Sequence, residues 1–290
     1  GYIGLEMAEA FIDRGDRVTL GDSAPVPLGA VDPDMGGRLA KVLERYGVDV
    51  RCGVEVTGFA DQVVQTSDGE IPADIAVLGL GVGPAADLAV DAGLDTGVAG
   101  AIAVNHRQRT SAAGVYAAGD CADTFHLVSR GRTYVALGTV ANKTGRVAGV
   151  NIGGGYASFP GVLGTAITRI CAVEVARTGL NEAEAAEAGI EHVTATIDAT
   201  SRAGYLPSAE PVTARVLAER GSGRIIGAQI LGADRVGKRI DTMATAITAG
   251  MSADQIVELD LGYAPAVTPL WDPFQVAARA ADRELRTGQA

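Results

Sequence analysis

Two helical segments, each followed closely by a short apolar strand, constrain the fold of this chain more than any other feature. Residues 1–15 carry apolar side chains at helical spacing. Asp32 and Pro33 mark the start of a second helix, because Asp is a frequent N-cap and Pro suits the first helical turn. Apolar strands are predicted at 18–20, 48–52 and 75–80. Helices that alternate with buried strands are typical of a parallel α/β sheet.

The rest of the chain departs from that alternation. Strands at 102–104 and 115–118 precede a helix at about 136–150. Four further strands are predicted at 165–175, 192–200, 212–219 and 224–231. A Gly-Ser-Gly turn at 221–223 joins the last two, which makes this sheet antiparallel. We therefore expect α/β structure in two parts, 1–100 and 101–156, and an α+β domain over 157–290.

Composition and charge narrow the classes of function. The 290 residues carry a formal net charge of −11, which disfavours a nucleic-acid partner. Cys52, Cys121 and Cys171 lie far apart and form no cluster with the three histidines, so we expect neither a disulfide framework nor a metal site. No apolar run approaches the length of about 18 residues that a membrane span needs. These features favour a cytoplasmic protein without a membrane partner.

The first four residues have the spacing of a nucleotide-binding glycine motif. Gly1 and Gly4 are spaced like the last two glycines of G-x-G-x-x-G, at the start of a helix whose dipole favours a phosphate. Asp22 ends the next strand, where a carboxylate accepts hydrogen bonds from a ribose and repels a 2′-phosphate. The sequence therefore favours NADH over NADPH as the ligand. The alternative is an ordinary helix start that contains two glycines.

Two further expectations concern this N-terminal motif. Glu6 either contacts the nicotinamide amide or is a solvated first-turn acid that the helix dipole favours. Because the chain opens within the motif, with Gly1 rather than Met, we expect upstream sequence that supplies the first strand of the NAD(P)H-binding domain. The alternative is a natural NAD-binding and dimerisation module that begins near Gly1 and has no catalytic activity.

The segment 110–120, which reads Thr-Ser-Ala-Ala-Gly-Val-Tyr-Ala-Ala-Gly-Asp, is the most specific pattern in the chain. It delivers Gly119 and Asp120 at the C-terminal end of a predicted strand, where α/β folds place ligand contacts. The segment resembles the second flavin-binding motif of the FAD-dependent pyridine nucleotide-disulfide oxidoreductases. This resemblance implies that Asp120 holds hydroxyl groups of the FAD ribityl chain and that Gly119 lies beside the cofactor.

The resemblance to this family covers essentially the whole chain. Residues 1–6 resemble its NADH motif, which implies cofactor contacts from Gly1, Ile3, Gly4 and Glu6. Residues 81–84 resemble its second glycine turn, with Gly83 in place of an Arg, which implies a contact from Gly81. Residues 137–146 resemble the helix that faces the flavin pyrimidine edge, which implies contacts from Leu137, Gly138 and Thr139. Residues 157–290 are similar to the C-terminal interface domain of the family, which implies a homodimer.

Two tyrosines indicate one branch of the family. Tyr263, in Leu-Gly-Tyr-Ala-Pro at 261–265, resembles the C-terminal signature of the coenzyme A-disulfide reductases and NADH oxidases. Tyr205 matches a second active-site tyrosine of that branch, although Leu206 stands where another tyrosine is common. The resemblance implies that Tyr263, from the partner subunit, and Tyr205 are catalytic. The alternative for both is interface packing with a satisfied hydroxyl group.

Two adjacent basic residues allow a further interpretation of the C-terminal part. Lys238 and Arg239 could contact a phosphorylated substrate tail. The favoured interpretation is a solvated face of the helix that the sequence predicts from residue 234.

The resemblance implies an FAD-dependent NAD(P)H oxidoreductase that passes hydride from NADH through the flavin to a disulfide, or to oxygen or peroxide. In the family a redox cysteine lies in the first domain, and none of the three cysteines here matches it. A cysteine-independent flavin reductase that donates electrons to a carrier protein or to oxygen is the alternative. We expect this chain to be inactive without an N-terminal FAD domain.

Overall fold

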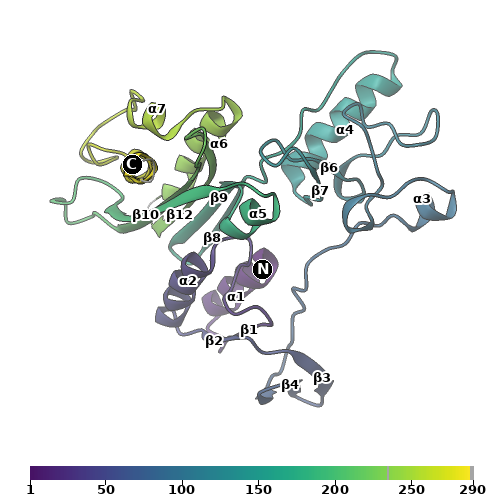
Figure 1. Cartoon of the computed structure of the whole chain (residues 1–290). Helices are drawn as coiled ribbons and strands as arrows, with labels where there is room; N and C mark the ends of the chain where they lie inside the picture. The colour runs from purple at the N-terminus through teal and green to yellow at the C-terminus, as the bar shows by residue number, and fades with distance from the viewer. Residues whose placement is uncertain (234, 288–290) are drawn as a thin grey trace. The chain divides into compact units, whose positions relative to one another are not determined.

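The computed structural model describes residues 1–233 and 235–287, which form two compact units. Unit 1 comprises Gly1–Gly81 and the chain from Ala166 onward, and unit 2 comprises Val82–Thr165. The predicted α/β fold with a C-terminal antiparallel sheet is confirmed (Figure 1). The predicted division at residues 100 and 156 stays a prediction. None of the described helices has the length and apolar character needed to cross a membrane.

The N-terminal part of unit 1 contains the predicted alternation of helices and parallel strands. α1 (Tyr2–Asp13) precedes β1 (Thr19–Asp22), and α2 (Pro33–Arg45) precedes β2 (Asp49–Cys52). β1 and β2 pair in parallel, and Asp32 is the N-cap of α2 with Pro33 in its first turn. A small antiparallel sheet follows, formed by β3 (Val56–Ala60), β4 (Val63–Thr66) and β5 (Gly69–Pro72).

The apolar run at 75–80 does not form the predicted strand. It has no ladder partner among the described residues, and Ile75 and Leu80 are exposed. An apolar run indicates a tendency to be buried, but a strand also needs a neighbouring strand with a free edge. The run instead passes beside the start of α1, where a Cβ atom on Gly79 would lie 3.0 Å from the backbone nitrogen of Gly4.

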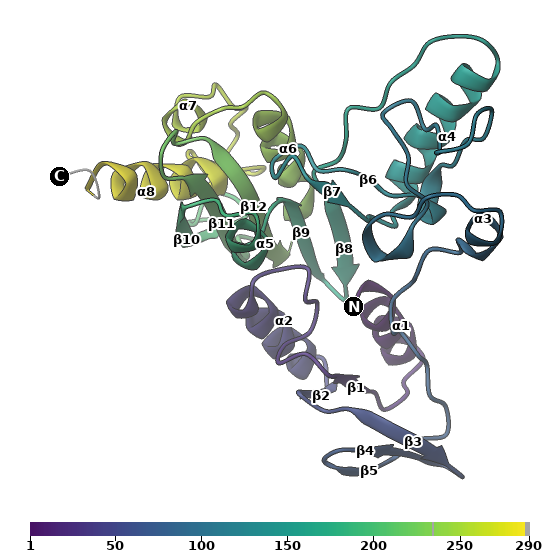
Figure 2. The ribbon, with the colours of Figure 1, turned by 45° about the vertical axis from the view of Figure 1, so that its right-hand side comes forward.

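The C-terminal part of unit 1 is a five-stranded antiparallel sheet in the order β10-β11-β12-β9-β8 (Figure 2). Its strands are β8 (Ala166–Ile170), β9 (Val173–Gly179), β10 (His192–Thr200), β11 (Pro211–Glu219) and β12 (Ile225–Ala233). The prediction of a single strand over 165–175 is wrong. Cys171 adopts a φ of 55° and turns the chain there, so β8 and β9 form a hairpin.

Helices of unit 1 pack against this sheet. α5 (Glu182–Glu187) and α7 (Ala253–Val257) each begin with the predicted capping box. The helix predicted from residue 234 corresponds to two helical segments, η3 (Val236–Arg239) and α6 (Ile240–Thr248). Residue 234 lies outside the described residues. α6 contacts β12 and β9, whereas α8 (Pro273–Thr287) contacts β10 and β11. The sequence analysis missed α8, although Asp272 and Pro273 repeat the start signal of α2.

The two parts of unit 1 share one hydrophobic core. Side chains of α1 and α2 pack with side chains of β8, β9 and β12, although about 150 residues separate them in the chain. The buried members are Leu5, Leu28, Val31, Met35, Leu39, Leu43, Val48, Ile170, Val175 and Leu231.

A row of polar side chains also crosses the sheet and binds the segment that precedes α2. Thr196, Arg215, Gln229 and Arg177 lie directly opposite one another on β10, β11, β12 and β9, so they share one face of the sheet. Arg215 Nη1 lies 2.8 Å from Asp32 Oδ2. Gln229 Nε2 donates to the same carboxylate at 2.6 Å, and the Asp32 N–H donates to Gln229 Oε1 at 2.9 Å.

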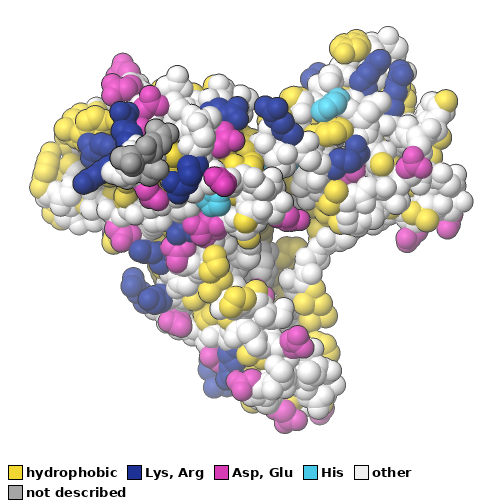
Figure 3. All heavy atoms as spheres, in the orientation of Figure 1, with side chains coloured by type: hydrophobic (Ala, Val, Ile, Leu, Met, Phe, Trp, Pro, Cys, Tyr) yellow, Lys and Arg dark blue, Asp and Glu magenta, His cyan; other side chains and the backbone are white. Residues whose placement is uncertain are grey.

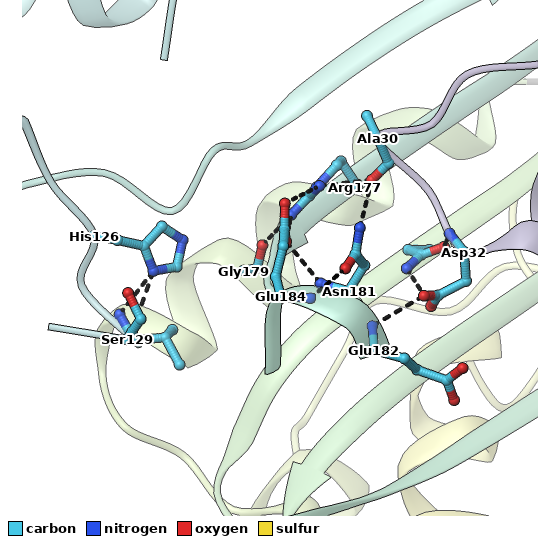
Figure 4. Close-up of polar contacts among 11 residues, drawn as sticks. Ala30, Asp32, His126, Ser129, Arg177, Gly179, Asn181, Glu182 and Glu184 are labelled. Carbon is cyan, nitrogen blue, oxygen red and sulfur yellow. Dashed lines mark hydrogen bonds and ion pairs between the residues drawn. The ribbon is translucent and has the colours of Figure 1, made fainter. Parts of the chain in front are cut away.

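The end of this polar row meets α5 (Figure 4). Arg177 donates to the carbonyl oxygen of Ala30 at 2.6 Å and to Glu184 Oε2 at 2.5 Å. Asp32 Oδ1 accepts a hydrogen bond from the backbone N–H of Glu182 at 2.9 Å. Residues 30–32 are therefore held by the sheet and by the N-terminus of α5 together.

Unit 2 contains the predicted helix, α4 (Gly138–Ile152), with α3 (Asp87–Asp91), η1 (Val98–Gly100), η2 (Gly119–Cys121), β6 (Thr124–Phe125) and β7 (Arg132–Thr133). The predicted strands at 102–104 and 115–118 are reduced to isolated bridges. Buried Asp123 accepts a hydrogen bond from the Val104 N–H at 3.2 Å, and Arg132 donates to the Val104 carbonyl at 2.8 Å. At Val104, side chains thus occupy the backbone groups that a ladder would use.

We expect the substitution Asp32→Ala to lower the free energy of unfolding by about 3–5 kcal/mol, because it leaves the buried Arg215 guanidinium without its buried partner. Asp34→Ala is the matched control, since Asp34 pairs with Arg215 at 2.5 Å but is half exposed. The control should cost less than about 1 kcal/mol. Chemical denaturation measures both, and equal losses would contradict this account of the polar row.

Candidate functional site

Gly1, Gly4 and Asp22, three of the predicted nucleotide-binding residues of unit 1, lie together at the start of α1. The Gly1 nitrogen lies 3.6 Å from Asp22 Oδ2, and a Cβ atom on Gly4 would lie 3.7 Å from a methyl group of Leu20. Gly81 adopts a φ of +85°, a conformation that favours glycine. Asp22 is the last residue of β1, so its carboxylate stands at the carboxyl edge of the parallel pair, where α/β folds bind ligands.

Ile3 and Glu6 both project from the first turns of α1. Ile3 is half exposed, whereas the buried residues of this helix are Leu5 and Ala8. Glu6 is exposed at its surface, and its Oε1 accepts a hydrogen bond of 3.1 Å from the hydroxyl group of buried Thr168 on β8. The sequence analysis missed Thr168, because no local pattern relates residues so far apart. A contact between Glu6 and the nicotinamide stays a prediction.

The predicted flavin residues of unit 2 also lie together. Gly119 has a φ of +77°, and a Cβ atom there would lie 3.4 Å from Cβ of Ala141 in α4. The N–H of Gly119 donates to the hydroxyl group of Thr144 at 3.0 Å. Asp120 follows in η2 and is exposed, and no described side chain bonds to its carboxylate. This carboxylate is available to accept hydrogen bonds from ligand hydroxyl groups.

The N-terminus of α4 is uncapped. Its N-cap, Leu137, has no side-chain acceptor, and Gly138 and Thr139 in the first turn are exposed. First-turn amides without intrahelical acceptors, together with the helix dipole, stabilise negative charge on a ligand. Asp120 and the start of α4 thus offer an acceptor and a set of donors in the same unit.

Tyr134 is a residue of this region that the sequence analysis missed. Its hydroxyl group donates to the carbonyl oxygen of Asp120 at 2.9 Å. Burial raises the pKa of the Tyr134 phenol above its ordinary value, and the charge of Asp120 adds to the effect. The phenol therefore stays protonated at neutral pH and supports the backbone from which the Asp120 carboxylate extends.

Tyr205 and Tyr263 lie on two loops of unit 1 that touch each other. Tyr205 is in the loop between β10 and β11 and is 76% exposed, and Tyr263 is in the segment before α8 and is 49% exposed. The N–H of Ala203 donates to the carbonyl oxygen of Pro265 at 3.1 Å, which joins the two loops. The structure thus brings together loops whose tyrosines are far apart in the sequence.

The cysteines have surroundings that suit small apolar side chains. Burial raises the pKa of the Cys52 and Cys171 thiols above the ordinary value, and nearby carboxylates, among them Asp22 beside Cys52, raise it further. A raised pKa disfavours the reactive thiolate. Cys121 Sγ lies 3.4 Å from the carbonyl oxygen of Ala118. Among the described residues, no group of three or more His, Cys, Asp or Glu side chains could hold a metal ion.

Comparison with the sequence profiles of known families shows which family the chain belongs to. The sequence profile of the pyridine nucleotide-disulphide oxidoreductases matches residues 1–145, and the profile of their dimerisation domain matches residues 165–272. The chain belongs to this family. The resemblance inferred from the glycine motifs and from the segment 110–120 is therefore confirmed.

Individual oxidoreductases of this family are similar over nearly the whole chain. A CoA-dependent NAD(P)H sulfur oxidoreductase of Pyrococcus furiosus is 38% identical over 285 residues, which cover 96% of this chain and 64% of that protein. An NADH oxidase of Methanocaldococcus jannaschii is 34% identical, with 98% of this chain and 64% of that protein covered.

A solved structure has the same fold. An NAD-dependent persulfide reductase from A. fulgidus superposes with a TM-score of 0.95 at 40% identity, over 99% of this chain and 54% of that one. The chain thus spans less than two thirds of the length of each of these relatives.

We expect Gly119→Ala to destabilise the protein by about 1–2 kcal/mol, because the new side chain would meet Ala141 and would have to adopt a left-handed conformation. Gly138→Ala is the control: a Cβ atom there has no neighbour within 4 Å, and no left-handed conformation is required. Thermal unfolding distinguishes the two variants. Equal behaviour would show that the close approach of Gly119 to α4 is unimportant.

Proposed function

We propose that the whole protein is an FAD-dependent oxidoreductase that oxidises NADH and reduces a small-molecule disulfide of the coenzyme A type. The reaction is NADH + H⁺ + RSSR → NAD⁺ + 2 RSH, in which two electrons and two protons reach the sulfur atoms. The observation that carries the proposal is the free carboxylate of Asp120 beside the uncapped N-terminus of α4. The two loops with Tyr205 and Tyr263 supply the argument for the acceptor.

The residues of unit 2 fit a flavin. Asp120 would accept hydrogen bonds from ribityl hydroxyl groups, and the amides of Gly138 and Thr139 would face an anionic edge of the ring system. Gly119 brings the backbone to this place without a side chain in the way. Bound FAD would supply two-electron transfer between a nicotinamide and a sulfur acceptor.

The residues of unit 1 fit NADH. Gly1 leaves the backbone open at the start of α1, where amides and helix dipole favour a pyrophosphate, and Gly4 permits close packing against Leu20 and Gly79. Asp22 would accept hydrogen bonds from the adenosine ribose and would repel the additional phosphate of NADPH. The Asp22 carboxylate is oriented by the N–H of Ala24, which donates to Oδ1 at 3.0 Å.

The tyrosines support a sulfur acceptor. Exposed phenol groups on two joined loops can donate hydrogen bonds to a disulfide or to the thiolate that leaves it, and a proton held on Tyr263 Oη would be at hand for that thiolate. Relatives named for sulfur or persulfide reduction are 38% and 40% identical to this chain. Oxygen or peroxide is the second candidate, because an NADH oxidase is 34% identical.

We further propose that the protein is a homodimer through the C-terminal part of unit 1, which matches the family's dimerisation domain. Large apolar side chains gather at the edge of unit 1 that carries the two tyrosine loops (left in Figure 3). They include Tyr205, Tyr263, Val267, Leu270 and Trp271. Exposed apolar clusters of this kind mark protein interfaces. A molar mass of a single chain in light scattering would contradict the dimer.

Anaerobic oxidation of NADH by the whole protein, with coenzyme A disulfide as acceptor, tests the main proposal. We expect the absorbance of NADH to fall with release of two thiols per NADH. A parallel measurement of oxygen uptake without the disulfide tests the second candidate. Fast oxygen uptake with no thiol release would reverse the choice between the two. Turnover of ferricyanide alone would favour a cysteine-independent flavin reductase, and no turnover at all would favour a non-catalytic module.

The nucleotide preference gives a separate prediction. Replacing Asp22 by Ala together with Ser23 by Arg should lower kcat/KM for NADH and raise it for NADPH, with a combined change in preference of about 100-fold, since a repulsive carboxylate is exchanged for a cation that pairs with phosphate. Asp49→Ala removes the same charge at the opposite end of the strand pair and serves as control. If both variants retained the parental preference, the assignment of the ribose site would be wrong.

A further inference from the structure

The guanidinium group of Arg239 contacts several segments of unit 1 at once. Arg239 ends η3, directly before α6, and its side chain is only 17% exposed. It forms an ion pair with Asp272 and donates to the hydroxyl group of Thr268 at 3.0 Å. It also donates to the carbonyl oxygens of Ser201 at 2.9 Å and Val267 at 3.4 Å. The expectation of a solvated helix face is therefore wrong for this residue.

Lys238 provides the contrast. Its side chain is 74% exposed and pairs with Asp241 within the same helical segment, as a solvated helix face would. Two adjacent cations thus differ completely in their surroundings. Only a planar guanidinium presents a fork of donors that can serve a carboxylate, a hydroxyl group and two carbonyl oxygens together.

The partners of Arg239 belong to the two loops that carry the tyrosines. Ser201 begins the loop that contains Tyr205, and Val267 and Thr268 follow Tyr263 in the segment before α8. Each loop therefore has backbone or hydroxyl groups bonded to one guanidinium.

We call the contacts of Arg239 with Ser201, Val267, Thr268 and Asp272 the Arg239 clamp. Asp272 connects this clamp to the core. Asp272, the charged partner of Arg239, also accepts a hydrogen bond from the N–H of Phe274 at 3.0 Å, and its own N–H donates to Gln275 Oε1 at 3.2 Å. Phe274 and Gln275 are buried in the first turn of α8. Through Asp272, the two loops are therefore attached to α8, a helix that packs against the sheet, and not only to each other.

Within a single chain, burial does not position Tyr205 and Tyr263, because their side chains are 76% and 49% exposed. Their placement depends on the backbone of the two loops, and that backbone depends on the contacts just described. We propose that Arg239 is a positioning residue, which holds the two tyrosine loops in one arrangement for the disulfide substrate. This inference rests on the proposed function.

The experiment compares Arg239→Met, Arg239→Lys and the control Lys238→Met in the full-length holoenzyme, with FAD content and thermal unfolding measured first. We expect Arg239→Met to lower kcat/KM for coenzyme A disulfide at least about tenfold, since small misplacements of substrate-contacting groups are costly. Turnover of NADH with ferricyanide, which does not need the tyrosines, should stay unchanged. Lys238→Met should match the parent in both assays, and Arg239→Lys should recover part of the loss through its pair with Asp272.

A double-mutant cycle separates positioning from a general loss of structure. If Arg239 acts through Tyr263, the variant Arg239→Met with Tyr263→Phe should be scarcely worse than Tyr263→Phe alone. Losses that multiply would overturn the proposal, as would an Arg239→Met enzyme with parental kcat/KM.

Limited digestion with chymotrypsin provides a readout that is independent of activity. Cleavage after Tyr205 and Tyr263 should accelerate at least about fivefold in Arg239→Met and remain unchanged in Lys238→Met. Loops without the Arg239 contacts adopt the extended conformation that a protease binds more often. An unchanged cleavage rate in Arg239→Met would show that Arg239 does not hold the two loops. A parent enzyme that reduces no disulfide contradicts the proposed function and the positioning role with it. The cleavage rates then still decide whether Arg239 holds the loops.

Discussion

Asp32 forms the contact on which the arrangement of unit 1 depends. Its carboxylate lies 2.8 Å from Arg215 and accepts hydrogen bonds from Gln229 and from the start of α5. A buried carboxylate is costly unless it is paired and hydrogen-bonded, and here a row of polar residues on neighbouring strands meets those needs. The strand register is what aligns this row, so the position of the N-terminal segment follows from the pairing of β11 with β12.

This connection makes one compact unit of two stretches that lie far apart in sequence. Residues 1–81 and the chain from 166 onward share a hydrophobic core, whereas residues 82–165, which separate these stretches in the sequence, form a unit of their own. The link extends to a predicted ligand residue, because Glu6 in the nucleotide motif is bonded to Thr168 of the C-terminal sheet. A change in that sheet can therefore alter the surroundings of the proposed NADH site.

The two proposed cofactor sites use the same physical device. In each unit a helix begins without a side-chain cap, a glycine lets the backbone come close, and an acidic residue stands near the helix start. The amides and dipole of the helix suit the anionic part of a dinucleotide, and the carboxylate suits its sugar or ribityl hydroxyl groups. The acidic residue near the helix start is Asp22 in unit 1 and Asp120 in unit 2.

Local chemistry allowed the sequence alone to predict several of the helix starts, although it missed the start of α8 and the turn at Cys171. The capping boxes at Asn181 and Ser252 join residues within a few positions of each other, so the sequence alone shows them. Asp32 and Pro33 also mark a helix start in the sequence, although the Asp32 carboxylate bonds to distant residues and does not cap α2. The sequence also identified the family, because its glycine and acidic residues recur at fixed spacing.

The tertiary structure alone decided the features that depend on distant partners. The run at 75–80 has the composition of a strand but finds no neighbour with which to pair. Thr168 has no distinguishing pattern in the sequence, and the sequence predicted a solvated position for Arg239. Both residues become important only where the fold brings Glu6 or the tyrosine loops to them. Hydrophobic periodicity predicts which residues are buried, whereas the identity of a long-range partner depends on strand order and register.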